Sequence, residues 1–150
     1  MRLTRAGEYA IRCMIYLAHK GQGVLVPKQE ICNHAEIPPH FLAKIAQELA
    51  KALLITIRQG PKGGYALLPK PEDISLLQVV EVMIGEITLN ECVDRPQSCT
   101  VSKSCSVHKV WARARNQLRE TLGAVSLAEL SEKESCIPVF AMQPKSSSRE

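Results

Sequence analysis

Residues 37–69 read IPPHFLAKIAQELAKALLITIRQGPKGGYALLP, and this stretch decides the fold. Pro38 and Pro39 break the preceding segment and preset the start of a helix, because proline is tolerated at the first helical position. One face of this helix is apolar, with Phe41, Leu42, Ile45, Ala46 and Leu49. The other face is polar, with His40, Lys44, Gln47 and Lys51. The spacing therefore predicts an amphipathic helix with a basic outer face.

Two short β-prone runs follow this helix, at residues 54–58 and 65–68. The segment between them, QGPKGG, is typical of a glycine-rich hairpin turn. It has neither the spacing of a phosphate-binding P-loop nor that of a dinucleotide-binding turn, so we interpret its glycines as turn residues. Arg58 and Lys62 then stand at the tip of the hairpin.

The segment upstream completes a known arrangement. Residues 4–19 show helical period, with Thr4 as a possible cap, and a short strand is expected at residues 24–26. Pro27 suits the first position of a second helix, residues 27–36. Two helices joined by a tight turn could form an ordinary helical hairpin with a solvated outer face. The basic-tipped β-hairpin instead favours a winged helix-turn-helix, whose second helix enters the major groove of DNA while the wing contacts phosphates or the minor groove.

Composition and charge agree with a partner that is a polyanion. Residues 1–70 hold ten Lys and Arg against four Glu, a net charge of +6, whereas residues 71–150 hold nine against eleven acidic residues, a net charge of −2. Chance asymmetry is the alternative. No apolar run approaches the roughly 20 residues of a membrane span, and the first residues do not form a secretory signal. We expect a cytoplasmic protein that is not an enzyme, with no membrane partner and no small-molecule substrate.

The second half of the chain predicts a linking helix, a polar loop and a long helix. The linking helix covers residues 71–85, and periodicity is then lost. The long helix runs from about residue 106 to Gly123 and carries an apolar stripe: Val107, Val110, Trp111, Ala114, Leu118 and Leu122. Basic residues cover its other sides: Lys109, Arg113, Arg115 and Arg119. The stripe either closes the core of the monomer or, as we expect, pairs with its copy in a homodimer.

The expected fold class is therefore mostly α with a small β-wing, a winged helix-turn-helix domain plus a long dimerisation helix. Its parts are residues 1–70, the DNA-binding domain; 71–85, the linking helix; 86–106, here called the cysteine loop; 107–132, the dimerisation helices; and 133–150, a disordered tail.

The cysteine loop and the turn after it contain Cys92, Cys99, Cys105 and His108, spaced C-x6-C-x5-C-x2-H. Thiols of a cytoplasmic protein are more often free or metal-bound than disulfide-linked. Gaps of six and five are wide for a zinc knuckle. An evenly spread set of thiols suits an iron–sulfur cluster better, although zinc and reactive thiols stay open. The other cysteines differ: Cys13 and Cys32 are expected to be buried hydrophobes, and Cys136 an exposed thiol of the tail.

Four stretches together resemble one family, the bacterial winged-helix regulators that include IscR, NsrR and CymR. They are MRLTRAGEYAIRCMIYLA at residues 1–18, GPKGGYAL at 60–67, ISLLQVVEVMIG at 74–85 and the cysteine pattern. The resemblance covers roughly residues 1–130. It implies a dimeric DNA-binding repressor or activator with a cluster-binding loop between the DNA-binding domain and the dimer helix.

The resemblance also implies a set of cluster ligands. IscR-like members have three cysteines and a histidine, which match Cys92, Cys99, Cys105 and His108 and imply a [2Fe–2S] cluster. NsrR-like members, which sense nitric oxide with a [4Fe–4S] cluster, use a carboxylate from the other subunit, and Glu8 falls at that position. CymR-like members lack the cysteines. Two departures matter: the first gap is six residues where IscR has five, and the residues of the recognition helix differ, so the operator sequence does not carry over.

The sequence therefore predicts a homodimeric transcription factor that binds double-stranded DNA and senses cluster supply, oxidation or nitric oxide. The residues expected to contact DNA are His40, Lys44, Gln47, Lys51, Arg58 and Lys62. The alternative is a zinc-stabilised or thiol-redox protein without a cluster.

Overall fold

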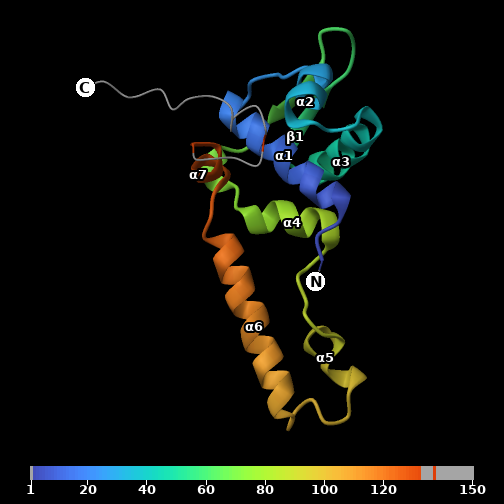
Figure 1. The fold of residues 1–150 in the computed structure, drawn as a ribbon, viewed down its shortest axis with the longest axis vertical. Coiled ribbons are helices and arrows are strands. Elements are labelled where there is room, and N and C mark those ends of the chain that lie inside the picture. Colours follow the sequence, from blue (N-terminus) through green and yellow to red (C-terminus); the bar gives the residue numbers. More distant parts are fainter. Residues whose placement is uncertain (1, 133–136, 138–150) are drawn as a thin grey trace, which may run out of the picture.

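The structure is a computed structural model that describes residues 2–132 and Ile137. It is mostly helical, with one two-stranded antiparallel sheet (Figure 1), so the predicted fold class is confirmed. The elements are α1 (Arg5–Lys20), α2 (Lys28–Ala35), α3 (Pro39–Lys51), β1 (Ile55–Arg58), β2 (Gly64–Leu67), η1 (Pro71–Asp73), α4 (Leu76–Ile84), α5 (Glu91–Asp94), η2 (Pro96–Ser98), α6 (Ser106–Gly123) and α7 (Leu127–Glu132). Of the predicted tail, Ile137 is described and its side chain is fully buried. The rest of the tail, with Cys136, lies outside the described residues.

Helix α1 is the centre of the winged domain. Thr4 caps it as predicted, since the Gly7 N–H donates to Thr4 Oγ1 at 3.1 Å. Cys13, Met14 and Leu17 lie on its buried face, and the helix packs against α2, α3, α4 and α7. The apolar period of the first twenty residues thus builds the core on which the other helices assemble.

The helix-turn-helix consists of α2, a turn at residues 36–38, and α3. Pro27 precedes α2 as its cap rather than opening it, a shift of one residue from the prediction. Glu36 takes the left-handed conformation with φ of 52°, and buried Ile37 anchors the turn by donating its N–H to Cys32 O at 3.1 Å. Pro39 stands at the start of α3, as expected.

The wing is the hairpin of β1 and β2, in which Ile55 pairs with Leu67 and Arg58 with Gly64. A side chain at Gly64 would place its Cβ 2.1 Å from Val26 O, so only glycine fits there. The predicted strand at residues 24–26 is wrong in extent: the segment makes isolated bridges to β2 rather than a strand. It still docks on the sheet, since Val26 and Tyr65 exchange backbone hydrogen bonds of 2.8 and 2.9 Å.

Helix α4 links this domain to α6. The expected single helix over 71–85 is interrupted, because Ser75 and Gln78 form a capping box that starts α4 after the turn η1. Ile74 and Val79 enter the main core, whereas Leu77 and Ile84 are only half-buried. The cysteine loop is more ordered than its lack of periodicity indicated, since it contains α5 and η2.

Helix α6 projects away from the winged domain, and the cysteine loop lies alongside it (Figure 1). Its bounds match the prediction, and within the described part of the chain none of its side chains is fully buried. Helix α7 then returns to α1, where Leu127 is buried and donates its N–H to Ile74 O at 2.9 Å. Along residues 2–132, no helix has the length and apolar character needed to cross a bilayer.

Candidate nucleic-acid interface and metal centre

The outer face of α3 carries the predicted polar residues in exposed positions: His40, Lys44, Gln47 and Lys51. The opposite face is buried in the core through Leu42, Ile45 and Leu49, so the helix cannot present any other side to a ligand. Lys51 is partly neutralised, since its Nζ lies 3.0 Å from Glu48 Oε1. Lys44 has no acidic partner within the described residues and is the freer cation of the two.

Aromatic contacts support the first turn of α3. The ring centroids of His40 and Phe41 are 4.7 Å apart. The ring centroids of Phe41 and of Tyr9 on α1 are 5.1 Å apart, in an edge-on arrangement. His40 is exposed, whereas Phe41 and Tyr9 are half-buried. The contact therefore holds the exposed imidazole ring against two aromatic rings that pack on the domain. Sequence reasoning placed Phe41 on an apolar face and missed that Phe41 and Tyr9 support His40.

The wing adds two further exposed cations, Arg58 and Lys62. Figure 1 shows the hairpin at the end of the molecule opposite to the start of α6. The structure therefore separates two regions: the α3 face and wing belong to the compact domain, whereas the cysteine loop lies at the far end of the projecting helix. An exposed helix face beside a basic hairpin is the arrangement that reads a DNA groove.

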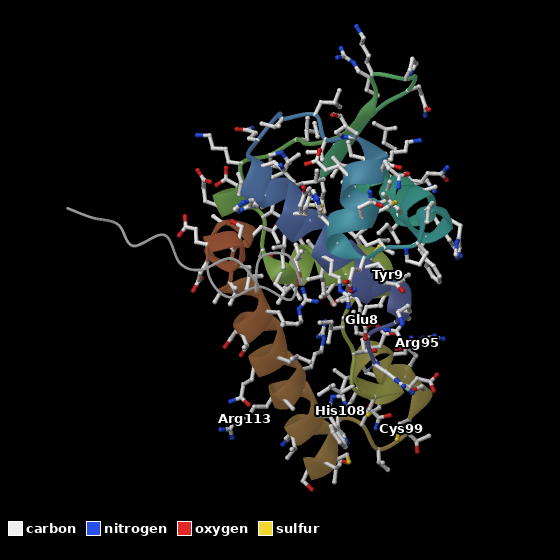
Figure 2. All side chains as sticks on the ribbon, turned by 45° about the horizontal axis from the view of Figure 1, so that its top comes forward. Glu8, Tyr9, Arg95, Cys99, His108 and Arg113 are labelled. Carbon is white, nitrogen blue, oxygen red and sulfur yellow. The ribbon has the colours of Figure 1, made fainter. Side chains whose placement is uncertain are left out.

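The fold places Cys92 beside the His108 ring and Cys105 at the start of the helix that carries His108. Cys92 is carried by α5, and its Sγ lies 3.5 Å from Nδ1 of His108. Cys105 caps α6, and its Sγ accepts the His108 N–H at 3.5 Å. Figure 2 places Cys99 in the loop at the same end of the molecule as His108. As the side chains stand, no three ligands among the described residues converge tightly enough to hold a metal ion.

The chemistry of this donor set fits an iron–sulfur cluster. The thiols of Cys92, Cys99 and Cys105 are all half-buried, so they are shielded from bulk water but remain reachable. Thiolates with one imidazole can ligate either such a cluster or zinc. Glu8, the alternative ligand, lies on α1 apart from these groups and pairs with Arg5 at 3.0 Å (Figure 2). Within one chain, His108 rather than Glu8 is therefore the candidate fourth ligand that lies beside a cysteine.

A buried hydroxyl closes the turn that carries Cys99. Ser102 is 5% exposed, and its Oγ donates to Pro96 O at 2.7 Å. The backbone N–H of Cys105 also donates to Val101 O at 2.8 Å. These bonds give the loop a defined shape between its second and third cysteines. Nothing in the spacing of the sequence singled out Ser102.

Of the remaining described cysteines, Cys13 is buried as predicted, whereas Cys32 is less buried than predicted. Cys13 is fully buried, and this burial raises the pKa of its thiol to about 12. Burial also raises the pKa of Cys32, which is half-buried. A thiol that stays protonated is a poor metal ligand and a poor nucleophile. These two residues are therefore packing groups, distinct from the cysteines of the loop.

The apolar stripe of α6 is uncovered over its first half. Val107, Val110 and Trp111 are 56%, 64% and 39% exposed, respectively. Further along the helix, Leu118 and Leu122 are half-buried. Exposed apolar side chains that are contiguous on one helix face mark an interaction surface. The partly buried half of the stripe fits the alternative that it closes the core of the monomer, whereas Val107, Val110 and Trp111 stay exposed in the monomer.

Comparisons with known proteins agree with this architecture. A family model described as Rrf2, iron-dependent transcriptional regulator, matches residues 3–133. The HTH-type transcriptional regulator IscR of Aliivibrio salmonicida is 29% identical over 130 residues, which cover 87% of this chain and 77% of the relative. The structure of CymR, the global cysteine regulator of B. subtilis, has a TM-score of 0.71 at 24% identity, covering 87% of this chain and 96% of that one. T. potens IscR has a TM-score of 0.63 at 23% identity, with coverages of 86% and 85%. The two structures support the fold.

Proposed function

The chain belongs to the Rrf2 family of transcriptional regulators, and from this premise we propose that it is a homodimer whose affinity for an operator depends on an iron–sulfur cluster held by the cysteine loop. Its relatives are DNA-binding transcriptional regulators rather than enzymes. The observation that carries the proposal is the division of the molecule into a basic DNA-reading end and a thiol-bearing end, joined by α4 and α6 (Figure 1).

At the DNA-reading end, α3 enters the major groove. His40, Lys44 and Gln47 face base edges, while Lys44 and Lys51 are also within reach of phosphates. Arg58 and Lys62 of the wing contact the backbone or the minor groove. Phosphate contacts fix register and supply salt-dependent affinity, whereas contacts to base edges supply specificity.

The exposed half of the α6 stripe pairs with the same stripe of a second copy. Val110 and Trp111 then leave water in both protomers, and burial of apolar and aromatic surface is the main favourable term in such association. A two-fold dimer presents two α3 helices to half-sites that lie about one helical turn of DNA, roughly 34 Å, or a multiple of it, apart.

At the thiol-bearing end, Cys92, Cys99, Cys105 and His108 hold the cluster, most simply a [2Fe–2S] cluster. The alternative is a [4Fe–4S] cluster with the partner's Glu8 as fourth ligand. When bound, such a cluster supplies a redox centre that responds to oxidants, nitric oxide and the supply of iron. In the chain itself, ligation requires the thiols to lose their protons and Cys99 to approach the Cys92–His108 pair, which reshapes the cysteine loop.

The competing proposal is a zinc-stabilised or thiol-redox protein. It is supported by the same contact, because a Cys92–His108 pair at 3.5 Å is also half of a tetrahedral zinc site. The two proposals differ in what the loop holds and in whether DNA affinity follows it.

Selection from a random DNA library tests the proposal. The protein is purified without oxygen, and half is stripped of iron with a chelator before both halves select DNA. We expect a two-fold symmetric sequence that is enriched by one form far more than by the other, and Gln47→Ala should relax the selected sequence. Equal enrichment by both forms would contradict the proposed regulation, and no enrichment by either would contradict DNA recognition.

A further inference from the structure

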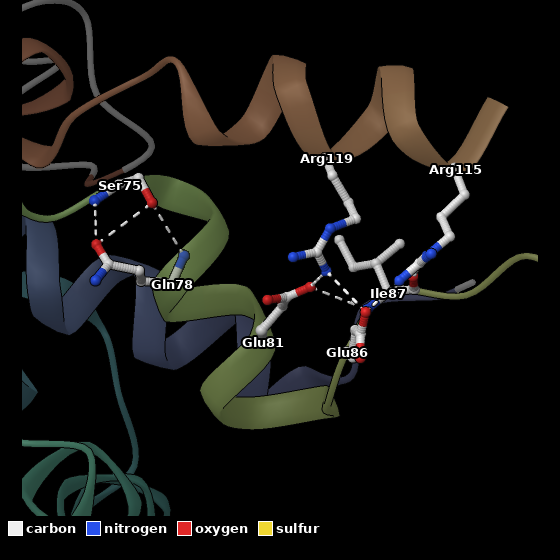
Figure 3. Close-up of polar contacts among 7 residues, drawn as sticks. All are labelled: Ser75, Gln78, Glu81, Glu86, Ile87, Arg115 and Arg119. Carbon is white, nitrogen blue, oxygen red and sulfur yellow. Dashed lines mark hydrogen bonds and ion pairs between the residues drawn. The ribbon is translucent and has the colours of Figure 1, made fainter. Parts of the chain in front are cut away.

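The peptide group of Ile87 is held from both sides at the point where the cysteine loop leaves α4. Its N–H donates to Glu81 Oε1 at 3.1 Å, and its carbonyl oxygen accepts from Arg115 Nε at 3.0 Å (Figure 3). The Ile87 side chain is 1% exposed. Two side chains from two different helices thus fix the position and the orientation of one peptide at the start of the loop.

The same side chains form ion pairs across the two helices. Arg119 pairs with Glu81, and Arg115 pairs with Glu86 (Figure 3). Arg119 Nη1 also lies 3.7 Å from Glu86 Oε1. We call these four residues the arginine clamp. Three of the side chains are only 22–29% exposed, whereas Glu86 is 57% exposed. Partly buried pairs are screened less than surface pairs, and removal of one member leaves a charge without its partner.

The clamp lies on the same face of α6 as the candidate ligand. His108, Arg115 and Arg119 are seven and four residues apart, which places all three on one side of the helix. One end of this face meets Cys92 of the loop, and the other end holds α4. Because the clamp binds Ile87 at the start of the loop, a movement of the first turn of α6 relative to the loop would change the contacts of the clamp.

Helix α4 is attached to the C-terminal helices at both of its ends. At its start, Leu76 N–H donates to Val125 O at 2.9 Å, and Leu127 N–H donates to Ile74 O at 2.9 Å. At its finish, the clamp is a polar attachment to α6. Helix α4 also packs on α1 and α3, and α3 carries the DNA-reading face. The clamp thus joins the end of α4, which packs on the winged domain, to α6.

We propose that Arg115 and Arg119 are positioning residues that convert a rearrangement of the cysteine loop into a change of angle between α6 and the winged domain. The inference rests on the proposed function. If α6 is fixed in the dimer, a change in this angle alters the distance between the two α3 helices and therefore the fit to two half-sites. Packed elements with two arrangements transmit such changes over long distances.

Arg119→Gln and Arg115→Gln test the clamp, with Arg113→Gln as the matched control. Arg113 lies on the same helix and loses the same charge, but its side chain is exposed and points away from α4 (Figure 2). For each protein, the iron and sulfide content, the dimer mass and the operator Kd with and without the cluster are measured. The ratio of the two Kd values is the coupling, which in allosteric proteins is about 5- to 150-fold.

We expect the clamp variants to keep their cluster and their dimer mass while the Kd ratio falls at least fivefold toward one. Arg113→Gln should keep the wild-type ratio. In cluster-free protein, hydrogen exchange at the Ile87 amide should quicken in Arg119→Gln and stay unchanged in Arg113→Gln. If Arg119→Gln does not fold, Glu81→Gln takes its place, since a glutamine oxygen still accepts the Ile87 N–H but carries no charge.

Two failures are distinguishable. A wild-type Kd ratio of one would contradict the proposed function itself. A wild-type ratio above one that persists in both clamp variants would overturn the positioning role alone. Loss of the ratio together with loss of the cluster would also overturn it, because the arginines would then act by holding the loop rather than by transmitting its shape.

Discussion

Removal of one lysine from the α3 face should change how DNA binding depends on salt. Lys44 is exposed and has no acidic partner among the described residues, so a bound phosphate would be its main counterion. Lys44→Ala deletes this charge without disturbing the core, since the buried side of α3 is formed by other residues. The variant therefore tests the contact with DNA rather than the stability of the fold.

The size of the effect follows from the charges on the DNA-reading face. Lys44, Arg58 and Lys62 of each protomer have no acidic partner among the described residues and are available to neutralise phosphates, whereas Lys51 contributes less because of Glu48. At about 0.9 in slope per phosphate, six contacts per dimer give a slope of about −5 in a plot of log K against log salt. Lys44→Ala removes two contacts, so the slope should become shallower by about 1.8. When salt is raised from 50 to 200 mM, the factor by which the affinity falls should therefore be about tenfold smaller for the variant than for the wild type.

Fluorescence anisotropy with a labelled operator, measured at four or more salt concentrations, gives both slopes. Lys109→Ala is the matched control, because Lys109 is an exposed lysine on α6, away from α3. Its slope should equal that of the wild type. The placement of DNA on the α3 face is refuted if Lys44→Ala keeps the wild-type slope, or if Lys109→Ala lowers the slope equally.

Three further predictions concern the dimer, the thiols and the fold. Trp111→Lys places a charge on the uncovered stripe and should weaken dimerisation by about 2 kcal/mol or more. Analytical ultracentrifugation should then find monomer at micromolar concentration, and an unchanged dimer would place the interface elsewhere. In cluster-free protein at pH 8, a thiol reagent should modify Cys99 quickly and Cys13 only after unfolding, since burial raises the pKa of Cys13 to about 12. Mass spectrometry locates the modified thiols, and rapid modification of Cys13 in the native protein would argue against its buried position. The Tyr16 hydroxyl donates a hydrogen bond of 2.7 Å to Glu30, and this bond lowers the pKa of the Glu30 carboxyl. The ionised carboxylate therefore stabilises the fold fully above its unfolded-state pKa of about 4.3, and this stabilisation is lost as the pH falls through the lower pKa of the folded state. Urea unfolding should therefore find Glu30→Gln less stable than the wild type at pH 7, with the difference shrinking by pH 3, and a constant difference would contradict the pKa shift.

The winged domain could be predicted from local signals. Two prolines, an apolar period and a glycine-rich turn fix α3 and the wing, and each acts within a few residues of itself. The capping box at Ser75 and Gln78 is a local signal too, and its three-residue spacing could have located the start of α4. The expected helix over 71–85 missed it because the apolar residues alone run on through the turn.

The clamp and the metal ligands depend on contacts between distant residues. Arg119 and Glu81 are 38 positions apart, so the sequence indicated only that Arg119 lies off the apolar stripe. The approach of His108 to Cys92 requires the intervening loop to fold back through α5 and η2. Spacing of cysteines identifies a set of candidate donors, but their convergence is a property of the folded loop.

Metal analysis of anaerobically purified protein tests most directly whether the cysteine loop holds an iron–sulfur cluster. The wild type should be coloured and contain iron and sulfide in equimolar amounts. Cys92→Ser should lose both, and comparison of His108→Ala with Glu8→Ala should identify the fourth ligand by the change in the absorption spectrum. A colourless wild-type protein with one zinc per chain and no sulfide would contradict the proposed cluster.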